Sequence, residues 1–169
     1  GTFKDAIKLH MSTLPSSFTR VEKYAFENCQ FITEFTLGNN IEYVGEAVFR
    51  GATRLATLTI PFVGSSIGLK TIDKTYETMF GWIFGLISST DALNDNANYS
   101  IVDSLRNVII TKDTDIASYA FYNVNMATYV SLPNTLQTLG DHAFMNCTNL
   151  DTIRMEEGIQ LTIIEEATF

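Results

Sequence analysis

Histidine and cysteine are scarce in this sequence, with two of each among 169 residues. His10 and His142 lie near opposite ends of the chain, whereas nucleophilic triads and zinc sites need several such side chains in one place. The sequence therefore gives no support for His-based catalysis or for a two-histidine metal centre. We expect no cofactor.

Basic residues and long apolar runs are also few. Lysine and arginine number 11 against 19 aspartates and glutamates, a net charge of -8 without any basic cluster. We therefore expect no nucleic-acid partner. The longest apolar stretch, residues 80–87, is interrupted by two glycines and is far shorter than the about 20 residues of a membrane span, so we expect no membrane insertion by this segment. With 46% hydrophobic residues the chain is typical of a globular domain.

What the sequence does contain is a repeat of 23 residues. The repeat is marked by Phe3, Phe26, Phe49, Phe121 and Phe144. A small or compact residue stands three positions after each phenylalanine, and apolar residues mostly stand six, nine and eleven positions after it. All three prolines, Pro15, Pro61 and Pro133, share the next column. A match in so many columns is hard to obtain by chance.

The pattern predicts a stack of short coils. Segments such as FTL, LTI and VSL alternate apolar and exposed positions, which is typical of short strands with one buried face. A single coil has too little apolar surface to fold alone, so neighbours must stack at about 4.8 Å per coil. We expect one domain over residues 3–169, a repeat solenoid of about six coils with short parallel β-strands, turns, little helix and a spine of stacked aromatic rings.

One coil departs from the period. The segment Ser104–Thr111 fits the strand columns, and counting back from it places Tyr99 in the phenylalanine column. The interval from Phe49 to Tyr99 then holds one coil plus an insertion of 27 residues within residues 62–98. If the insertion is the binding element, its deletion should abolish binding and leave a folded stack.

The repeated segments resemble a known family. "VEKYAFENCQFITEFTLGNNIEYVGEAVF" and "LGDHAFMNCTNLDTIRM" are similar to the BspA-type leucine-rich repeats, whose consensus runs Ile-Gly-x-x-Ala-Phe-x-x-Cys-x-x-Leu-x-x-Ile-x-Ile-Pro. The resemblance implies a right-handed leucine-rich-repeat coil, export to the bacterial cell surface, and binding of host or microbial ligands. The chain shows no leader with the pattern of an export signal, and we expect it to be a trimmed segment.

The alternate strand positions form an exposed sheet face, which is where solenoids usually bind partners. The candidate ligand-binding residues are Glu34, Thr36, Thr57, Thr59, Asn107, Tyr129, Ser131, Thr152 and Arg154, with Ile109 among them on the face. Hydroxyls, one tyrosine and two charges suit contact with a protein or a glycan. The plainer alternative is that threonine is only a favourable strand residue.

The insertion offers a second candidate, an apolar patch of Phe80, Trp82 and Phe84. Such a patch on a loop can be a docking site. More often the segment folds back and covers a flank of the solenoid, which is the interpretation we favour.

Two further features suggest a calcium site and a disulfide, but each has a simpler interpretation. A run near the end of the insertion offers oxygen ligands for calcium in Asp91, Asn94, Asp95 and Asn96. The run lacks the glycine and the terminal glutamate of an EF-hand loop, so we favour a solvated turn and predict no metal.

Cys29 and Cys147 share a column with Ala6 and Ala52, which predicts buried core residues about 20 Å apart. This distance is too long for a disulfide.

The sequence therefore predicts a non-catalytic binding or adhesion module of a secreted or surface protein. A structural spacer that presents another domain is the alternative. A glycan-cleaving parallel β-helix is a third and weaker one, because the exposed columns hold only Glu34 and Arg154 as charges, several coils apart. Both end coils lack a polar cap, so we also expect end-to-end self-association.

Overall fold

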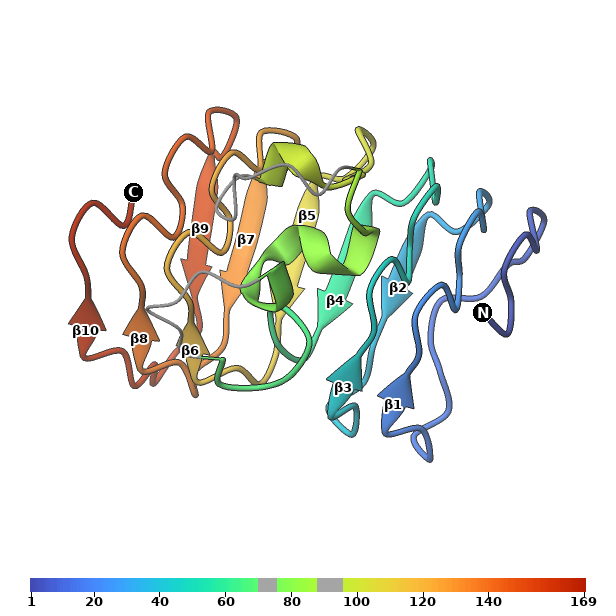
Figure 1. Cartoon of the computed structure of the whole chain (residues 1–169). Helices are drawn as coiled ribbons and strands as arrows, with labels where there is room; N and C mark the ends of the chain where they lie inside the picture. The colour runs from blue at the N-terminus through green and yellow to red at the C-terminus, as the bar shows by residue number, and fades with distance from the viewer. Residues whose placement is uncertain (70–75, 88–95) are drawn as a thin grey trace.

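The computed structural model describes residues 1–69, 76–87 and 96–169, which wind into a stack of short coils (Figure 1). Five parallel strands form one long sheet in the order β2-β4-β5-β7-β9, here called the main sheet. Its strands are β2 (Glu34–Thr36), β4 (Thr57–Ile60), β5 (Asn107–Ile110), β7 (Tyr129–Leu132) and β9 (Thr152–Met155). The predicted solenoid of parallel strands is confirmed.

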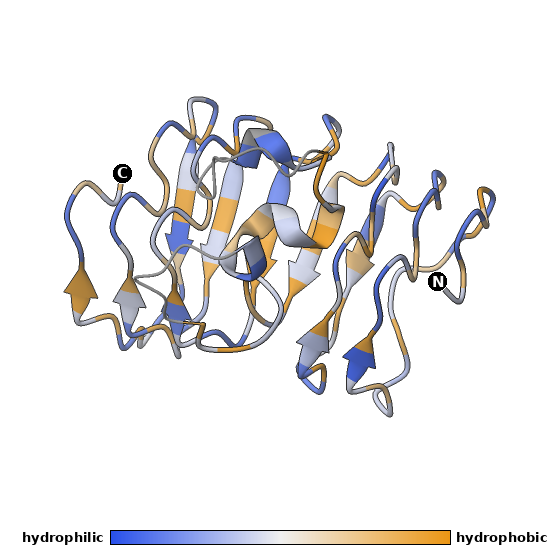
Figure 2. Ribbon diagram, in the orientation of Figure 1, coloured by the Kyte–Doolittle hydropathy of each residue, from blue (hydrophilic) through white to orange (hydrophobic). Residues whose placement is uncertain are grey.

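The register of the main sheet follows the repeat. Each strand pairs with the next so that equivalent columns stand side by side. The middle column points inward. Phe35, Leu58, Val108 and Val130 are at most 1% exposed, whereas Ile153 in the last strand is half-buried. A bridge between Thr13 and Thr36 adds the first coil to the sheet. Figure 2 shows the resulting alternation of apolar and polar positions along the strands.

A second row of two-residue strands runs along another side of the coils (Figure 1). These strands are β1 (Arg20–Val21), β3 (Tyr43–Val44), β6 (Asp115–Ile116), β8 (Thr138–Leu139) and β10 (Ile163–Ile164). β1 pairs with β3, while β6, β8 and β10 form a separate sheet. The sequence predicts an apolar column here but no strands, because two residues are too few to show a period of two. Where this row is interrupted after β3, the carbonyl of Ser65 in the insertion accepts the backbone N–H of Val44 at 2.9 Å.

Stacked phenylalanine rings form a spine inside the coils. One stack consists of Phe3, Phe26 and Phe49, and another of Phe121, Phe144 and Phe169. Neighbouring ring centroids lie 4.9 to 5.7 Å apart. Two residues after the ring the backbone turns with positive φ, at 60° for Asn28 and 71° for Gly51. Glycine and asparagine tolerate this conformation best, which explains the polar turn column of the repeat.

The spine crosses the irregular coil through a residue of the insertion. Phe80 begins the 3-10 helix η2 (Phe80–Phe84), and its ring stacks on Phe121 at 4.8 Å. Its backbone N–H donates to the carbonyl preceding Phe121 at 2.8 Å, as the other spine residues do toward the next coil. At the other end of η2, the carbonyl of Ile83 accepts the N–H of Phe49 at 2.9 Å. The helix therefore takes the place that the phenylalanine-containing turn has in the regular coils.

The prediction that Tyr99 fills this column is wrong. Tyr99 forms an isolated antiparallel bridge with Leu86, and its hydroxyl donates to the carbonyl of Tyr76 at 2.8 Å. Tyr76 begins η1 (Tyr76–Thr78), and Tyr99 follows η3 (Asn96–Asn98) directly. Counting back from the strand columns assumes a regular turn, whereas the insertion supplies a helical turn of its own.

Two buried polar side chains fix the insertion to the stack. The amide of Asn96 donates to two carbonyls beside Phe121, at 3.1 and 2.9 Å, and accepts a backbone N–H of η2 at 2.8 Å. The carboxylate of Asp113 accepts the backbone N–H groups of Val63 and Gly68 at 2.9 and 3.0 Å. Because both side chains are buried, these bonds are shielded from water and hold the insertion in one position.

Candidate functional site on the main sheet

The outward face of the main sheet carries the residues predicted to bind a ligand. One row of this face is Glu34, Thr57, Asn107, Tyr129 and Thr152, and the other is Thr36, Thr59, Ile109, Ser131 and Arg154. Apart from Ser131, every member is exposed or half-buried. The structure therefore brings these residues onto one face, spaced by about 4.8 Å along each row.

Ser131 is the exception, at 4% exposure. Its side chain is the shortest in its row and lies between Ile109 and Arg154 of the neighbouring strands. Longer neighbours on both sides screen a short side chain even where the strand points outward. The prediction that Ser131 is exposed is therefore wrong, and we leave it out of the candidate site.

A hollow of about 350 Å³ lies on this face where the first three coils meet. It is lined by Ser12, Thr13, Glu34, Phe35, Thr36, Thr57 and Thr59. Four of these residues belong to the predicted face. Sequence reasoning missed Ser12 and Thr13, although a signal was available, because Thr13 precedes Thr36 by one period of 23 residues.

The charge on the face is sparse and divided. Glu34 stands in β2 at one edge of the main sheet and Arg154 in β9 at the other, four strand spacings or about 19 Å apart. The residues between them are uncharged, and the amide of Asn107 donates to the Thr57 hydroxyl at 3.1 Å. Two groups so far apart cannot act on one bond of a substrate. The face is instead suited to many small polar contacts.

The predicted insertion patch is not exposed. Phe80 and Phe84 are 1% and 0% exposed. Trp82 is half-buried, and its Nε1–H donates to the carbonyl of Val44 at 2.8 Å. The structure shows the interpretation that the sequence favours, in which the described part of the insertion folds back onto the solenoid. The physical reason is that the irregular coil has no spine phenylalanine of its own.

Of the four residues weighed as calcium ligands, only Asn96 lies within the described residues. Asp91, Asn94 and Asp95 lie outside the described residues, and the amide of Asn96 is used on backbone groups. Within residues 1–69, 76–87 and 96–169, no group of three or more His, Cys, Asp or Glu side chains is placed to bind a metal ion. No helix in the same ranges is long and apolar enough to cross a membrane.

Both cysteines are free thiols. Cys29 is buried, as predicted, and its S–H donates to the carbonyl of Phe3 at 3.1 Å. Cys147 is half-buried and not buried as predicted, because it lines the open hollow at the last coil, and its S–H donates to the carbonyl of Phe121 at 3.0 Å. Burial raises the pKa of the Cys147 thiol to about 11. A thiol that stays protonated near neutral pH is a weak nucleophile, so these cysteines serve packing.

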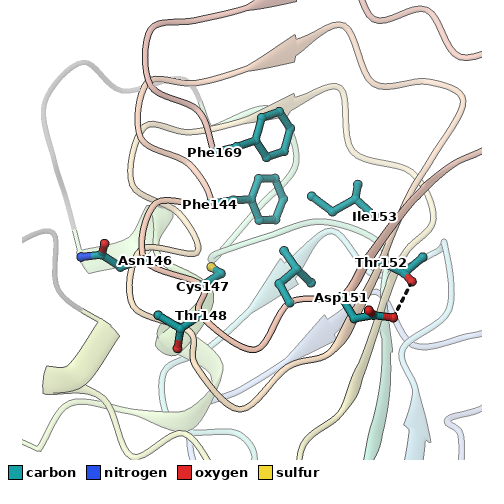
Figure 3. A pocket seen from close by; sticks show the side chains of 9 residues that line it. Phe144, Asn146, Cys147, Thr148, Asp151, Thr152, Ile153 and Phe169 are labelled. Carbon is teal, nitrogen blue, oxygen red and sulfur yellow. Dashed lines mark hydrogen bonds between the residues drawn. The ribbon is translucent and has the colours of Figure 1, made fainter.

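A second hollow, of about 420 Å³, opens at the last coil (Figure 3). The rings of Phe144 and Phe169 form one wall, and Ile153 of β9 faces them. Thr152 donates its hydroxyl to the Asp151 carboxylate at 3.1 Å, away from the rings. The hollow offers apolar contact without convergent polar groups that would orient a small ligand. Self-association through the end coils stays a prediction.

The sequence matches one family model over most of its length. This model, described as the BspA type leucine rich repeat region, matches residues 1–78 and 91–169 in six copies. No curated protein matches the sequence.

Three solved structures are similar to the chain at low identity. A leucine rich cell surface protein from Faecalibacterium prausnitzii is 17% identical with a TM-score of 0.49, covering 85% of this chain and 31% of that protein. A leucine-rich repeat protein from Bacteroides ovatus is 20% identical with a TM-score of 0.38, covering 91% and 45%. A leucine rich repeat protein from T. pallidum is 16% identical with a TM-score of 0.37, covering 90% and 72%. This chain therefore spans about a third of the Faecalibacterium protein.

Proposed function

Because this chain belongs to the BspA-type leucine-rich-repeat family, we propose that it is a non-catalytic binding module that holds a protein or a glycan on the outward face of its main sheet. The module would act in adhesion as part of a secreted or cell-surface protein. The family resemblance supports this location, since the repeats are typical of bacterial surface proteins.

The observation that carries the proposal is the polar, exposed face of the main sheet. Its backbone groups are already paired between strands, so a ligand would meet side chains alone. These side chains are held in register at strand spacing by a buried core on the other side of each strand. A rigid array of this kind loses little conformational entropy on binding, which allows many weak contacts to add up.

The proposal is tested by screening the domain against arrays of glycans and extracellular-matrix proteins. For a ligand found there, Tyr129→Ala or Arg154→Glu should weaken binding at least about threefold, the loss expected from one contact of about 0.7 kcal/mol. Neither change should lower the melting temperature, because both side chains lie on the outward face. Arg20→Glu is the matched control, since it reverses an exposed arginine in β1, off the main sheet.

A structural spacer is the alternative function. A spacer predicts that no ligand is found on any array, and that the face variants behave like the wild type in every binding assay. Binding that persists unchanged in both Tyr129→Ala and Arg154→Glu would also contradict the proposal, because it would place the ligand elsewhere on the domain.

A further inference from the structure

Two hollows adjoin at the N-terminal part of the main sheet. The hollow on the face has a volume of about 350 Å³, and a second one of about 240 Å³ lies beside it. The second is lined by His10, Met11, Ser12, Phe31, Ile32, Thr33 and Glu34. Both are lined by Ser12 and Glu34, so the two hollows lie side by side on the first three coils. We call the pair the N-terminal groove.

The lining of the N-terminal groove is rich in hydroxyl groups. They come from Ser12, Thr13, Thr33, Thr36, Thr57 and Thr59. A hydroxyl both donates and accepts hydrogen bonds, as the hydroxyls of a sugar do, and the threonine methyls offer apolar contact to the C–H groups of a sugar ring. Glu34 is the single carboxylate of the lining, and neither lysine nor arginine lines it.

The hydroxyls are ordered along the axis of the solenoid. Thr13 bridges to Thr36, and Thr36 pairs with Thr59, so the same side chain recurs once per coil at about 4.8 Å. This spacing is close to the length of one sugar unit in an extended β-linked glycan. A glycan lying along the axis would therefore present one ring to each coil.

The groove is less suited to a protein partner. Binding hot spots in protein interfaces are usually exposed aromatic or arginine anchors in a pocket. Two phenylalanines line the groove, and neither ring is free to anchor a partner. Phe35 is 1% exposed, and Phe31 already has the Arg54 guanidinium 4.4 Å from its centroid and the His10 ring edge-on at 5.6 Å. A peptide strand added over the face would need free backbone groups, and those of β2 and β4 are paired with each other.

We infer that the N-terminal groove binds an extended, uncharged β-linked glycan, with one sugar ring over each of the first three coils. This inference rests on the proposed function and narrows it to one ligand class and one part of the face. Glu34 sets the charge preference, because its carboxylate accepts hydrogen bonds from sugar hydroxyls but repels a carboxylate or sulfate on the ligand.

The first test is a length series by isothermal titration calorimetry on the whole domain. β-1,4-linked gluco-, manno- and N-acetylglucosamine oligosaccharides of two to six rings are compared, together with the gluco series oxidised at C6 to glucuronates. At least one neutral series should gain affinity up to three rings and then level off, and the glucuronates should bind at least about fivefold more weakly, a difference of about 1 kcal/mol. Failure of every neutral series to bind at millimolar concentration, or tighter binding of the glucuronates, would overturn the inference.

The second test uses variants that keep size and shape. Thr36→Val and Thr59→Val remove one hydroxyl each and should weaken the neutral series threefold to tenfold, since one hydrogen bond contributes about 0.5–1.5 kcal/mol. Thr19→Val is the matched control, because Thr19 is exposed and directly precedes β1, off the main sheet, and this variant should bind as the wild type does. Glu34→Gln should reduce the penalty of the glucuronates relative to the neutral series. Equal effects of Thr36→Val and Thr19→Val would contradict the assignment to this groove.

The two proposals fail differently. If a protein ligand is found whose affinity depends on Tyr129 and Arg154, while no neutral glycan binds, the module is a binder and the groove inference is wrong. If neither a protein nor a glycan binds, the proposed function itself is wrong. Circular dichroism of each variant at the assay temperature excludes unfolding as the cause of lost binding.

Discussion

Replacing Phe80 by alanine tests whether the insertion is part of the core. The ring is 1% exposed, stacks on Phe121 at 4.8 Å and contacts Phe84 at 5.7 Å. Removing a buried phenylalanine costs about 3–5 kcal/mol, and each aromatic pair contributes about 0.5–1.5 kcal/mol of such a loss. We expect Phe80→Ala to lower the free energy of unfolding by about 4 kcal/mol, a large part of the about 5–15 kcal/mol of a typical domain.

The measurement is urea unfolding followed by two probes. Far-ultraviolet circular dichroism reports on all coils, whereas fluorescence reports on Trp82, the single tryptophan, which lies in η2. In a solenoid each coil is stabilised mainly by its neighbours, so weakening the middle coil should separate the two transitions in Phe80→Ala. Phe80→Leu keeps most of the volume and should cost less than half as much. Ile87→Ala, at a position 66% exposed, should change stability by less than about 0.5 kcal/mol.

A loss below about 1 kcal/mol in Phe80→Ala, with coincident transitions, would refute the role of Phe80 in the spine. The same reasoning changes the expectation for the deletion of residues 62–98. Because this segment contains Phe80, Phe84 and other buried residues, its removal should leave an open core and a domain that fails to fold cooperatively.

Two other predictions concern a turn and a buried carboxylate. Gly51→Ala should destabilise the fold by about 1–2 kcal/mol, because φ is 71° there. Gly38→Ala should be nearly neutral, because nothing lies within 4 Å of the added Cβ. Thermal unfolding compares the two variants, and equal effects would contradict the argument from backbone conformation. Burial raises the pKa of Asp113 to about 6 against the opposing effect of its backbone N–H bonds. The folded chain therefore holds this proton more tightly than the unfolded chain does. The resulting contribution to stability, about 3 kcal/mol at most, is full below about pH 4 and is lost as the pH rises through 6. Urea midpoints between pH 4 and 7 should show this loss in the wild type and less of it in Asp113→Asn, and an identical profile in the variant would count against the raised pKa.

The periodic part of the fold could be read from the sequence because every coil must meet the same packing demands. The columns of Phe35, Leu58, Val108 and Val130 are buried as the pattern indicates, and the register between strands follows the 23-residue period. The outward positions of the same strands follow by alternation, so most of the candidate face was predictable as well. The short strands of the second row were not, because two residues carry no periodicity.

The sequence by itself determined the period, the buried columns and the outward face, since stacking repeats the same environment at each coil and so leaves the same residue types in each copy. Only the tertiary structure decided that Phe80 and not Tyr99 completes the spine, because a 3-10 helix can present a ring to a gap from any position in an irregular segment. It also decided that Ser131 is covered, which depends on the lengths of side chains in neighbouring strands. The N-terminal groove likewise exists only in three dimensions, because its hydroxyls come from three coils that stacking brings side by side.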